Sequence, residues 1–171
     1  AGILPELLEV SIREPFNPTT TSQNTAGSGM NITSMLLDAW GNLDESQTHV
    51  RLPHAFPPSE PIESDAVTVA VHASSQRLNR LLFLIERWGG PVSASIYVNS
   101  EHDIVTLLDF NWYHAEALKY TDIHILMEER DKFEYPHNIL RNMALQSIQS
   151  EYFLALDVDF VTTPNAAHSL H

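Results

Sequence analysis

The chain has 171 residues with 22 acidic and 9 basic side chains, so its formal net charge is −13. Such a negative field, without a run of basic residues, argues against binding to nucleic acid or to an anionic membrane. The absence of cysteine excludes disulfide bonds, cysteine-bound zinc and a thiol nucleophile. The longest apolar runs, such as residues 81–85, are far too short to span a bilayer.

Residues 1–66 have the composition of a proline-rich, partly disordered stem or linker. They hold seven of the ten prolines and a polar run over residues 17–34, which has too little apolar surface to offset its ordering entropy. Two short apolar segments, 4–12 and 35–40, could dock as helical turns. The chain begins at Ala1 without a signal peptide, and we expect it to be a piece of a longer protein.

From residue 67 onward, predicted strands and helices alternate. Residues 67–71 form a β-branched run that predicts a buried strand. A helix follows, capped by Ser74 or Ser75, with apolar residues at helical spacing and a stop at residues 89–91. Residues 92–98 predict the second strand.

The same alternation continues to the end of the chain. Ser100 is expected to begin a helix, and residues 122–127 alternate as a third strand. Pro136 favours the start of a helix that runs to about Ser150. Residues 152–156 predict a fourth buried strand.

This order of elements predicts an α/β fold with a mostly parallel sheet and helices on both faces. In such sheets ligands bind outside the carboxyl ends of the strands, where the strand order reverses. The side chains that leave the predicted strands at this edge are therefore candidate site residues: Ser74, Ser75 and Arg77 after the first strand, and Asp157 and Asp159 after the fourth.

The Asp157-Val158-Asp159 sequence is the sharpest chemical feature. In extended backbone, residues i and i+2 point to the same side, so both carboxylates can face one cation. Carboxylates suit Mg²⁺ or Mn²⁺, above all when a diphosphate completes the coordination shell. A solvated polar turn is the alternative, since such a pair also arises by chance.

A second set of polar residues lies on the helix that Pro136 begins. Asn138, Arg141 and Asn142 share one face near its start because they are spaced i, i+3, i+4. Arg141 could bind a diphosphate or a sugar carboxylate through its planar guanidinium, or it could orient Asp157 or Asp159. An ordinary solvent-exposed face with an ion pair is the alternative.

Arg77 could bind phosphate together with the amide groups of the helix that follows the first strand, although a surface arginine also fits the pattern. No glycine-rich phosphate loop accompanies it, which argues against a dinucleotide dehydrogenase and a P-loop enzyme. His72 and His137 lie near the presumed site, where we interpret them as partly buried or surface histidines without a ligand.

The second segment resembles the glycosyltransferase family 49 domain over about residues 67–171. This family includes the glucuronyltransferase half of LARGE-type enzymes and the related β-1,4-glucuronyltransferase. The resemblance rests on the following residues: Val67-Thr68-Val69, Ser74, Arg77-Leu78, Trp88-Gly89-Gly90-Pro91, Tyr135-Pro136-His137-Asn138-Ile139-Leu140-Arg141-Asn142, Tyr152-Phe153-Leu154 and Asp157-Val158-Asp159-Phe160.

The resemblance implies a GT-A (Rossmann-like) fold and transfer of glucuronic acid, with inversion, from UDP-glucuronate to a glycan acceptor. It implies a type II membrane protein of the Golgi lumen, whose anchor is missing from this chain. It places a divalent cation, usually Mn²⁺, on Asp157 and Asp159. The UDP-sugar donor would contact Ser74, Arg77, Asn138, Arg141, Asn142 and Asp157.

Two departures qualify these implications. His72-Ala73 and Ser75-Gln76 replace a polar-aliphatic pair and a Met-Asp pair of the family, so donor selectivity could differ. An inverting transferase also needs a base for the acceptor hydroxyl, and in a GT-A enzyme this base follows the D-x-D sequence. We therefore expect the base beyond residue 171, and expect residues 67–171 to be an N-terminal nucleotide-sugar-binding half that is inactive alone.

Three hypotheses are compatible with the sequence: a truncated metal-dependent UDP-sugar transferase, a donor-binding remnant without catalysis, and a non-enzymatic α/β interaction domain. Metal-dependent binding of UDP separates the first two from the third. The donor sugar, the acceptor, the linkage and the oligomeric state stay open at this point.

Overall fold

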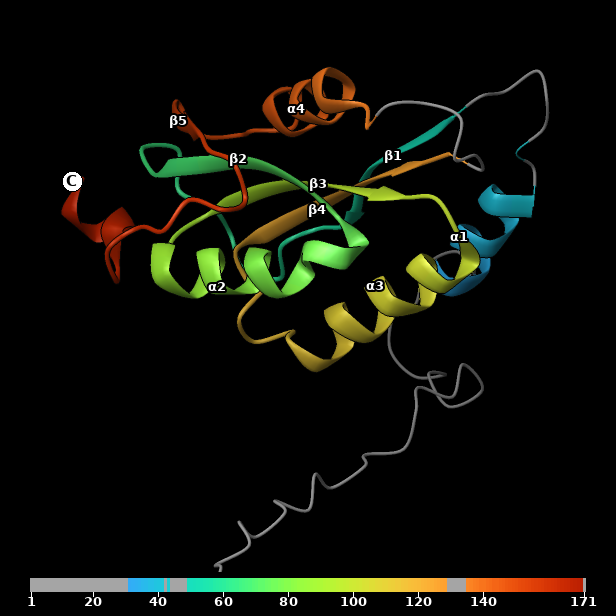
Figure 1. Cartoon of the computed structure of the whole chain (residues 1–171). Helices are drawn as coiled ribbons and strands as arrows, with labels where there is room; N and C mark the ends of the chain where they lie inside the picture. Colours follow the sequence, from blue (N-terminus) through green and yellow to red (C-terminus); the bar gives the residue numbers. More distant parts are fainter. Residues whose placement is uncertain (1–30, 42, 44–48, 129–134, 171) are drawn as a thin grey trace, which may run out of the picture.

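The computed structural model describes residues 31–41, 43, 49–128 and 135–170. These residues form a five-stranded sheet with helices on both faces (Figure 1). In chain order the elements are α1 (Ile32–Gly41), β1 (Val50–Phe56), β2 (Val67–Ser74), the 3-10 helix η1 (Ser75–Arg77), α2 (Leu78–Trp88), β3 (Val92–Val98), α3 (Glu101–Tyr113), β4 (Thr121–Met127), α4 (His137–Gln146), β5 (Tyr152–Ala155) and the 3-10 helix η2 (Ala166–Ser169).

The strand order in the sheet is β1-β4-β3-β2-β5. Strands β4, β3, β2 and β5 are parallel to one another, whereas β1 pairs antiparallel with β4. The chain passes from β2 to β3 and β4 on one side and later returns to place β5 on the other side of β2. The strand order therefore reverses at β2, and the carboxyl ends of β2 and β5 meet at this switch point.

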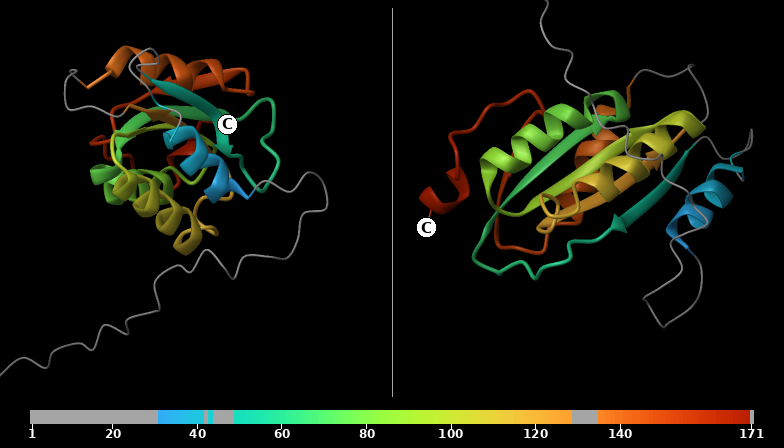
Figure 2. Two further views of the ribbon diagram at one scale, coloured as in Figure 1. Left: turned by 90° about the vertical axis from the view of Figure 1, so that its right-hand side faces the viewer. Right: turned by 90° about the horizontal axis from the view of Figure 1, so that it is seen from below.

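The helices form two layers around the sheet. Helix α4 covers one face, over β2 and β3, while α2 and α3 cover the opposite face (Figures 1 and 2). On α2 the side chains of Leu81, Leu84, Ile85 and Trp88 are buried against the sheet, as their helical spacing predicts. Every residue of β3 and of β4 is buried, because these strands are covered on both faces.

The α/β fold with a mostly parallel sheet and helices on both faces is confirmed. Strand β3 has the bounds that the sequence predicts, and α2 ends where predicted but begins only at Leu78, after η1. Helix α2 ends at Gly89, whose φ of 69° is in the left-handed region that favours glycine. The Ser100 side chain caps α3 by accepting a hydrogen bond from the backbone N–H of Asp103.

Three local predictions were wrong. The side chain of Ser74 makes no capping hydrogen bond, and the Ser75 hydroxyl bonds to Asp103 instead. Helix α4 ends at Gln146 rather than near Ser150. All four residues of β5 are exposed, because β5 is an edge strand that pairs only with β2 among the described strands.

Part of the first segment belongs to the same core. Strand β1, which we did not predict, extends the sheet, and α1 packs beside α3 and β1. The side chains of Leu36, Ala55 and Phe56 are buried in the main hydrophobic cluster. Helix α1 and strand β1 therefore belong to the same packed unit as the sheet, whereas residues 4–12 and 17–30 lie outside the described part. No helix among the described residues has both the length and the apolar character needed to cross a membrane.

Candidate functional site

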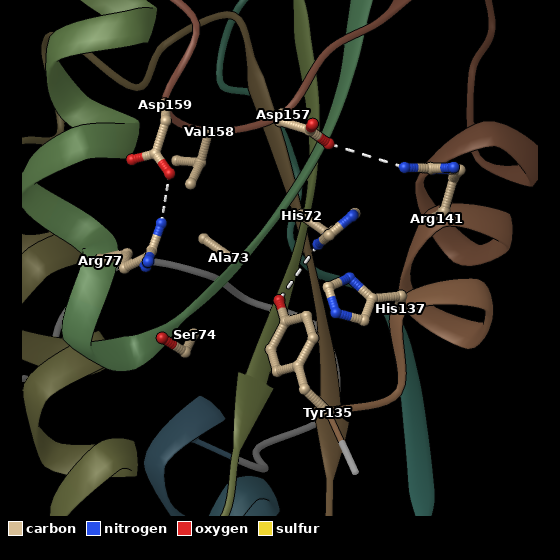
Figure 3. Close-up of a pocket in the computed structure, with 10 residues that line it drawn as sticks. All are labelled: His72, Ala73, Ser74, Arg77, Tyr135, His137, Arg141, Asp157, Val158 and Asp159. Carbon is tan, nitrogen blue, oxygen red and sulfur yellow. Dashed lines mark hydrogen bonds and ion pairs between the residues drawn. The ribbon is translucent and has the colours of Figure 1, made fainter.

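A polar pocket of about 580 Å³ opens at the carboxyl ends of β2 and β5, where the strand order reverses (Figure 3). This volume is within the range of small-molecule sites. The pocket is lined by His72, Ala73, Ser74, Arg77, Tyr135, His137, Arg141, Asp157, Val158 and Asp159.

One wall of the pocket is formed by the end of β2 and by η1, which carry Ser74 and Arg77. The buried carboxylate of Asp103 holds this segment from behind. It accepts one hydrogen bond from the Ser75 hydroxyl and another from the backbone N–H of Asn99, at 3.1 Å. The short η1 turn is thereby tied to the start of α3, which fixes where Arg77 enters the pocket.

A second wall is the turn after β5, which carries Asp157 and Asp159. The backbone N–H of Phe160 donates to the carbonyl of Asp157 at 2.9 Å and closes this turn. Val158 is buried in the core, so both carboxylates are held at the surface. The backbone here is a turn and not the extended segment that the i, i+2 argument assumed, and the two carboxylates point toward different partners (Figure 3).

Each of the two carboxylates faces its own arginine. Asp159 pairs with Arg77, and Oδ1 of Asp157 lies 3.6 Å from Nη2 of Arg141. All four side chains are more than half exposed, and exposed ion pairs of this kind contribute about 0–1 kcal/mol to stability. Stability therefore does not account for the arrangement, whereas the two carboxylates can bind a cation and the two guanidinium groups can bind an anion.

Helix α4 supplies the third wall through His137 and Arg141. The two asparagines predicted beside them, Asn138 and Asn142, are exposed and do not line the pocket. The structure thus brings Ser74, Arg77, Arg141, Asp157 and Asp159 together around one cavity.

A cluster of three ring side chains at the base of the pocket was not predicted as part of the site. Nδ1 of His72 lies 3.1 Å from the Tyr135 hydroxyl, and the His72 and His137 rings are 5.5 Å apart, centroid to centroid. His72 is buried, and its Nε2 has no hydrogen-bond partner among the described residues. Its position at the end of a buried strand, on the ligand-binding edge, was the signal that could have identified it.

The pKa values in this cluster favour neutral side chains. Burial lowers the pKa of His72, and the nearby His137 and Arg141 lower it further, against an opposing effect of Asp157. Burial raises the pKa of Tyr135 to about 12. At neutral pH the base of the pocket therefore carries an uncharged imidazole and a protonated phenol, between the charged Asp–Arg pairs.

Comparison with known proteins identifies one family. The family described as glycosyl-transferase for dystroglycan matches residues 66–129 and 113–171. The matched region contains the pocket and all of its lining residues.

Individual relatives match the same part of the chain. The chain is 30% identical over 105 residues to the glycosyltransferase-like protein gnt15 of Dictyostelium discoideum, covering 61% of this chain and 20% of that protein. It is 33% identical over 110 residues to the mouse xylosyl- and glucuronyltransferase LARGE2, covering 64% and 15%. It is 24% identical over 149 residues to zebrafish beta-1,4-glucuronyltransferase 1, covering 61% and 35%. The match therefore spans no more than about a third of any of these three relatives.

Proposed function

This chain belongs to the family of glycosyl-transferases for dystroglycan, and we propose that it is the nucleotide-sugar-binding part of a metal-dependent, inverting glycosyltransferase. The proposed reaction transfers a sugar from a UDP-sugar to a glycan acceptor, with glucuronic acid from UDP-glucuronate as the first candidate. The names of the mouse and zebrafish relatives, which both include a glucuronyltransferase, support this choice of donor. Following the family resemblance, we place the enzyme in the Golgi lumen as a type II membrane protein.

The observation that carries the proposal is the pair of exposed Asp–Arg contacts across one pocket at the switch point of the sheet. A UDP-sugar with its cation presents both signs of charge, since the diphosphate is anionic and the metal is cationic. Asp157 and Asp159 offer oxygen ligands that suit Mn²⁺ or Mg²⁺. Arg77 and Arg141 offer planar donors that suit a diphosphate or a glucuronate carboxylate.

Each pocket residue would contact a different part of the donor complex. Asp157 and Asp159 would hold the cation, which when bound neutralises the charge that develops on the UDP leaving group. Arg77, together with Ser74, would bind the diphosphate from the β2 side. Arg141 would contact the donor from α4, and Asn138 and Asn142, which lie on the exposed face of α4, would contact only a ligand that extends beyond the pocket.

The proposal is tested by thermal unfolding of the 171-residue chain with UDP, with and without Mn²⁺. We expect UDP with Mn²⁺ to raise the melting temperature more than either does alone, since a ligand that binds only the folded state stabilises it. Asp157→Asn and Asp159→Asn should each remove the joint effect, because they remove a metal ligand without changing side-chain size. Asp65→Asn, which changes an exposed carboxylate outside the pocket, is the matched control and should retain it.

A cooperative unfolding transition that UDP and Mn²⁺ leave unchanged would overturn the donor site and favour an interaction domain. Binding that persists in both aspartate variants would overturn the assignment of the metal ligands.

A further inference from the structure

A second group of metal-ligating side chains lies at the other edge of the sheet, on the two antiparallel strands. It consists of His54 on β1 and Asp122 and His124 on β4, and their ligand atoms all lie within 4.8 Å of one another. Because the strand order is β1-β4-β3-β2-β5, β3 separates this cluster from the strands that form the pocket. The proposed transferase function does not use this cluster.

The ring of His124 is oriented by hydrogen bonds on its inner side. Its Nε2 lies 2.9 Å from the Ser93 hydroxyl, and that hydroxyl donates to the carbonyl of Ala144 at 2.7 Å. With its proton committed to Ala144, the hydroxyl can only accept from Nε2, so the Nε2–H tautomer is fixed. The lone pair of Nδ1 therefore faces His54 and Asp122. Metal-binding histidines commonly have their second ring nitrogen fixed in this way.

The carboxylate of Asp122 has one oxygen without a partner. Its Oδ2 contacts Nδ1 of His54 at 2.6 Å, whereas its Oδ1 is buried, has no hydrogen-bond partner among the described residues and lies 3.9 Å from Nδ1 of His124. A buried carboxylate oxygen without a hydrogen bond is unfavourable. A cation between the carboxylate and the two imidazole rings would satisfy it.

His54 is the solvent-exposed member of the cluster, and its backbone conformation is unusual. Its side chain is 45% exposed, so a metal ion and a water ligand can reach the cluster from outside. Its φ of 53° is uncommon for a residue other than glycine, and its backbone N–H donates to Nδ1 of His124 at 2.9 Å. In the structure this N–H and the His54–Asp122 contact hold the three residues together.

We propose that His54, Asp122 and His124 form a zinc site that fastens the edge strand β1 to β4. Two imidazoles, one carboxylate and a water molecule are a ligand set that suits Zn²⁺, with metal–ligand distances of about 2.0–2.2 Å. Zn²⁺ binding would separate Nδ1 of His54 from Oδ2 of Asp122, which are 2.6 Å apart in the structure, to the distance between two ligands of a tetrahedral ion, and would release any proton that the two atoms share. The metal ion would also replace the backbone N–H of His54 as the partner of Nδ1 of His124.

The test is a Zn²⁺ titration of the 171-residue chain against a chromophoric chelator, in an Asp157→Asn/Asp159→Asn background that removes the proposed pocket metal. We expect one equivalent of Zn²⁺ to bind, and Co²⁺ to give the visible absorption of a tetrahedral site. His54→Gln and Asp122→Asn should each weaken Zn²⁺ by more than about tenfold, and Ser93→Ala by about tenfold, as expected when the residue that orients a ligand is removed.

His102→Gln is the matched control, since it alters an exposed histidine on α3 outside the cluster, and it should bind Zn²⁺ as the background does. His54→Gln replaces a half-exposed side chain, so its folding can be verified by its melting temperature. Absence of stoichiometric Zn²⁺ binding would overturn the proposal, and so would binding that survives in the folded His54→Gln variant. Neither result bears on UDP binding, which is measured separately without the double substitution.

Discussion

At the scale of single residues, Arg141 could have either of two roles in the pocket. Its guanidinium lies 3.6 Å from Asp157, so it can neutralise that carboxylate or bind the donor. We expect Arg141→Ala to weaken UDP-glucuronate about tenfold more than UDP if the guanidinium contacts the sugar carboxylate, since a charge-assisted hydrogen bond contributes about 1.5–3 kcal/mol.

The measurement is isothermal titration of both ligands in the presence of Mn²⁺, with Arg80→Ala as the control because Arg80 is exposed and does not line the pocket. Equal losses for UDP and UDP-glucuronate would instead assign Arg141 to the diphosphate or to Asp157.

His124 makes the stability of the chain depend on pH. In the unfolded chain a histidine takes up a proton near pH 6.5, whereas folded His124 remains neutral down to a pKa of about 4. The unfolded state therefore binds more protons in this interval, and the free energy of unfolding should fall as the pH is lowered through it, by up to roughly 3 kcal/mol. The pKa of His72 is also lowered and acts in the same direction.

The pKa of Asp122 is raised by burial, against the opposing effect of its hydrogen bond to His54. The contribution of Asp122 to stability therefore has the opposite sign: it is present below the pKa of the unfolded chain and is lost as the pH rises through the folded pKa.

Urea unfolding near pH 7 and near pH 5 should show a smaller loss of stability in His124→Asn than in the wild-type chain. A variant whose stability falls as steeply as the wild type would disprove the assignment to His124.

At the scale of elements, the end of α2 depends on two consecutive glycines. Gly89 has a φ of 69°, and a Cβ there would lie 2.9 Å from Oδ1 of Asn165. A Cβ on Gly90 would lie 2.5 Å from the Cβ of Ala167 in η2. The close approach of η2 to the end of α2 therefore requires the absence of both side chains, and it holds the chain after the Asp157–Asp159 turn against α2.

Gly89→Ala should lower the free energy of unfolding by about 1–2 kcal/mol, because alanine is strained at positive φ. Gly90→Ala should displace η2 and speed amide exchange around Ala167. Gly41→Ala is the control, since nothing lies within 4 Å of the added Cβ. Denaturant unfolding of the three variants measures the difference, and equal stability of Gly89→Ala and Gly41→Ala would contradict it.

At the scale of the whole molecule, β5 leaves an apolar edge on the sheet. Tyr152, Phe153 and Leu154 are exposed, and Phe160 and Val161 are exposed in the segment that follows. Exposed apolar edge strands favour pairing between chains. We expect the 171-residue chain to self-associate with rising concentration, and Phe153→Lys to reduce this association with a small effect on stability, since Phe153 is 54% exposed.

Sedimentation velocity over a range of concentrations tests this prediction, with Leu37→Lys as the control because Leu37 is an exposed apolar residue on α1, which packs beside β1 at the opposite edge of the sheet. If the two lysine variants associate alike, β5 is not the contact surface.

The sequence by itself determined the features that depend on neighbours along the chain. The helical spacing of the apolar residues determined the buried face of α2, the Gly89 stop determined its end, and the Ser100 cap fixed the start of α3. The strand–helix alternation determined the α/β class, and with it the sheet edge at which Ser74, Arg77 and the two aspartates would meet. Asp157 and Asp159 were recognised because their chemistry and their position after a strand are both local properties.

Only the tertiary structure decided which side chains meet across long separations. It placed β5 at an edge and thereby exposed a strand that its apolar sequence predicted to be buried. It brought His54 beside Asp122, which lies 68 positions later, through an antiparallel strand that the sequence did not predict. It also paired Asp159 with Arg77 rather than aligning it with Asp157. Pairing and burial depend on strand order and on the contacts of each face, which no local pattern encodes.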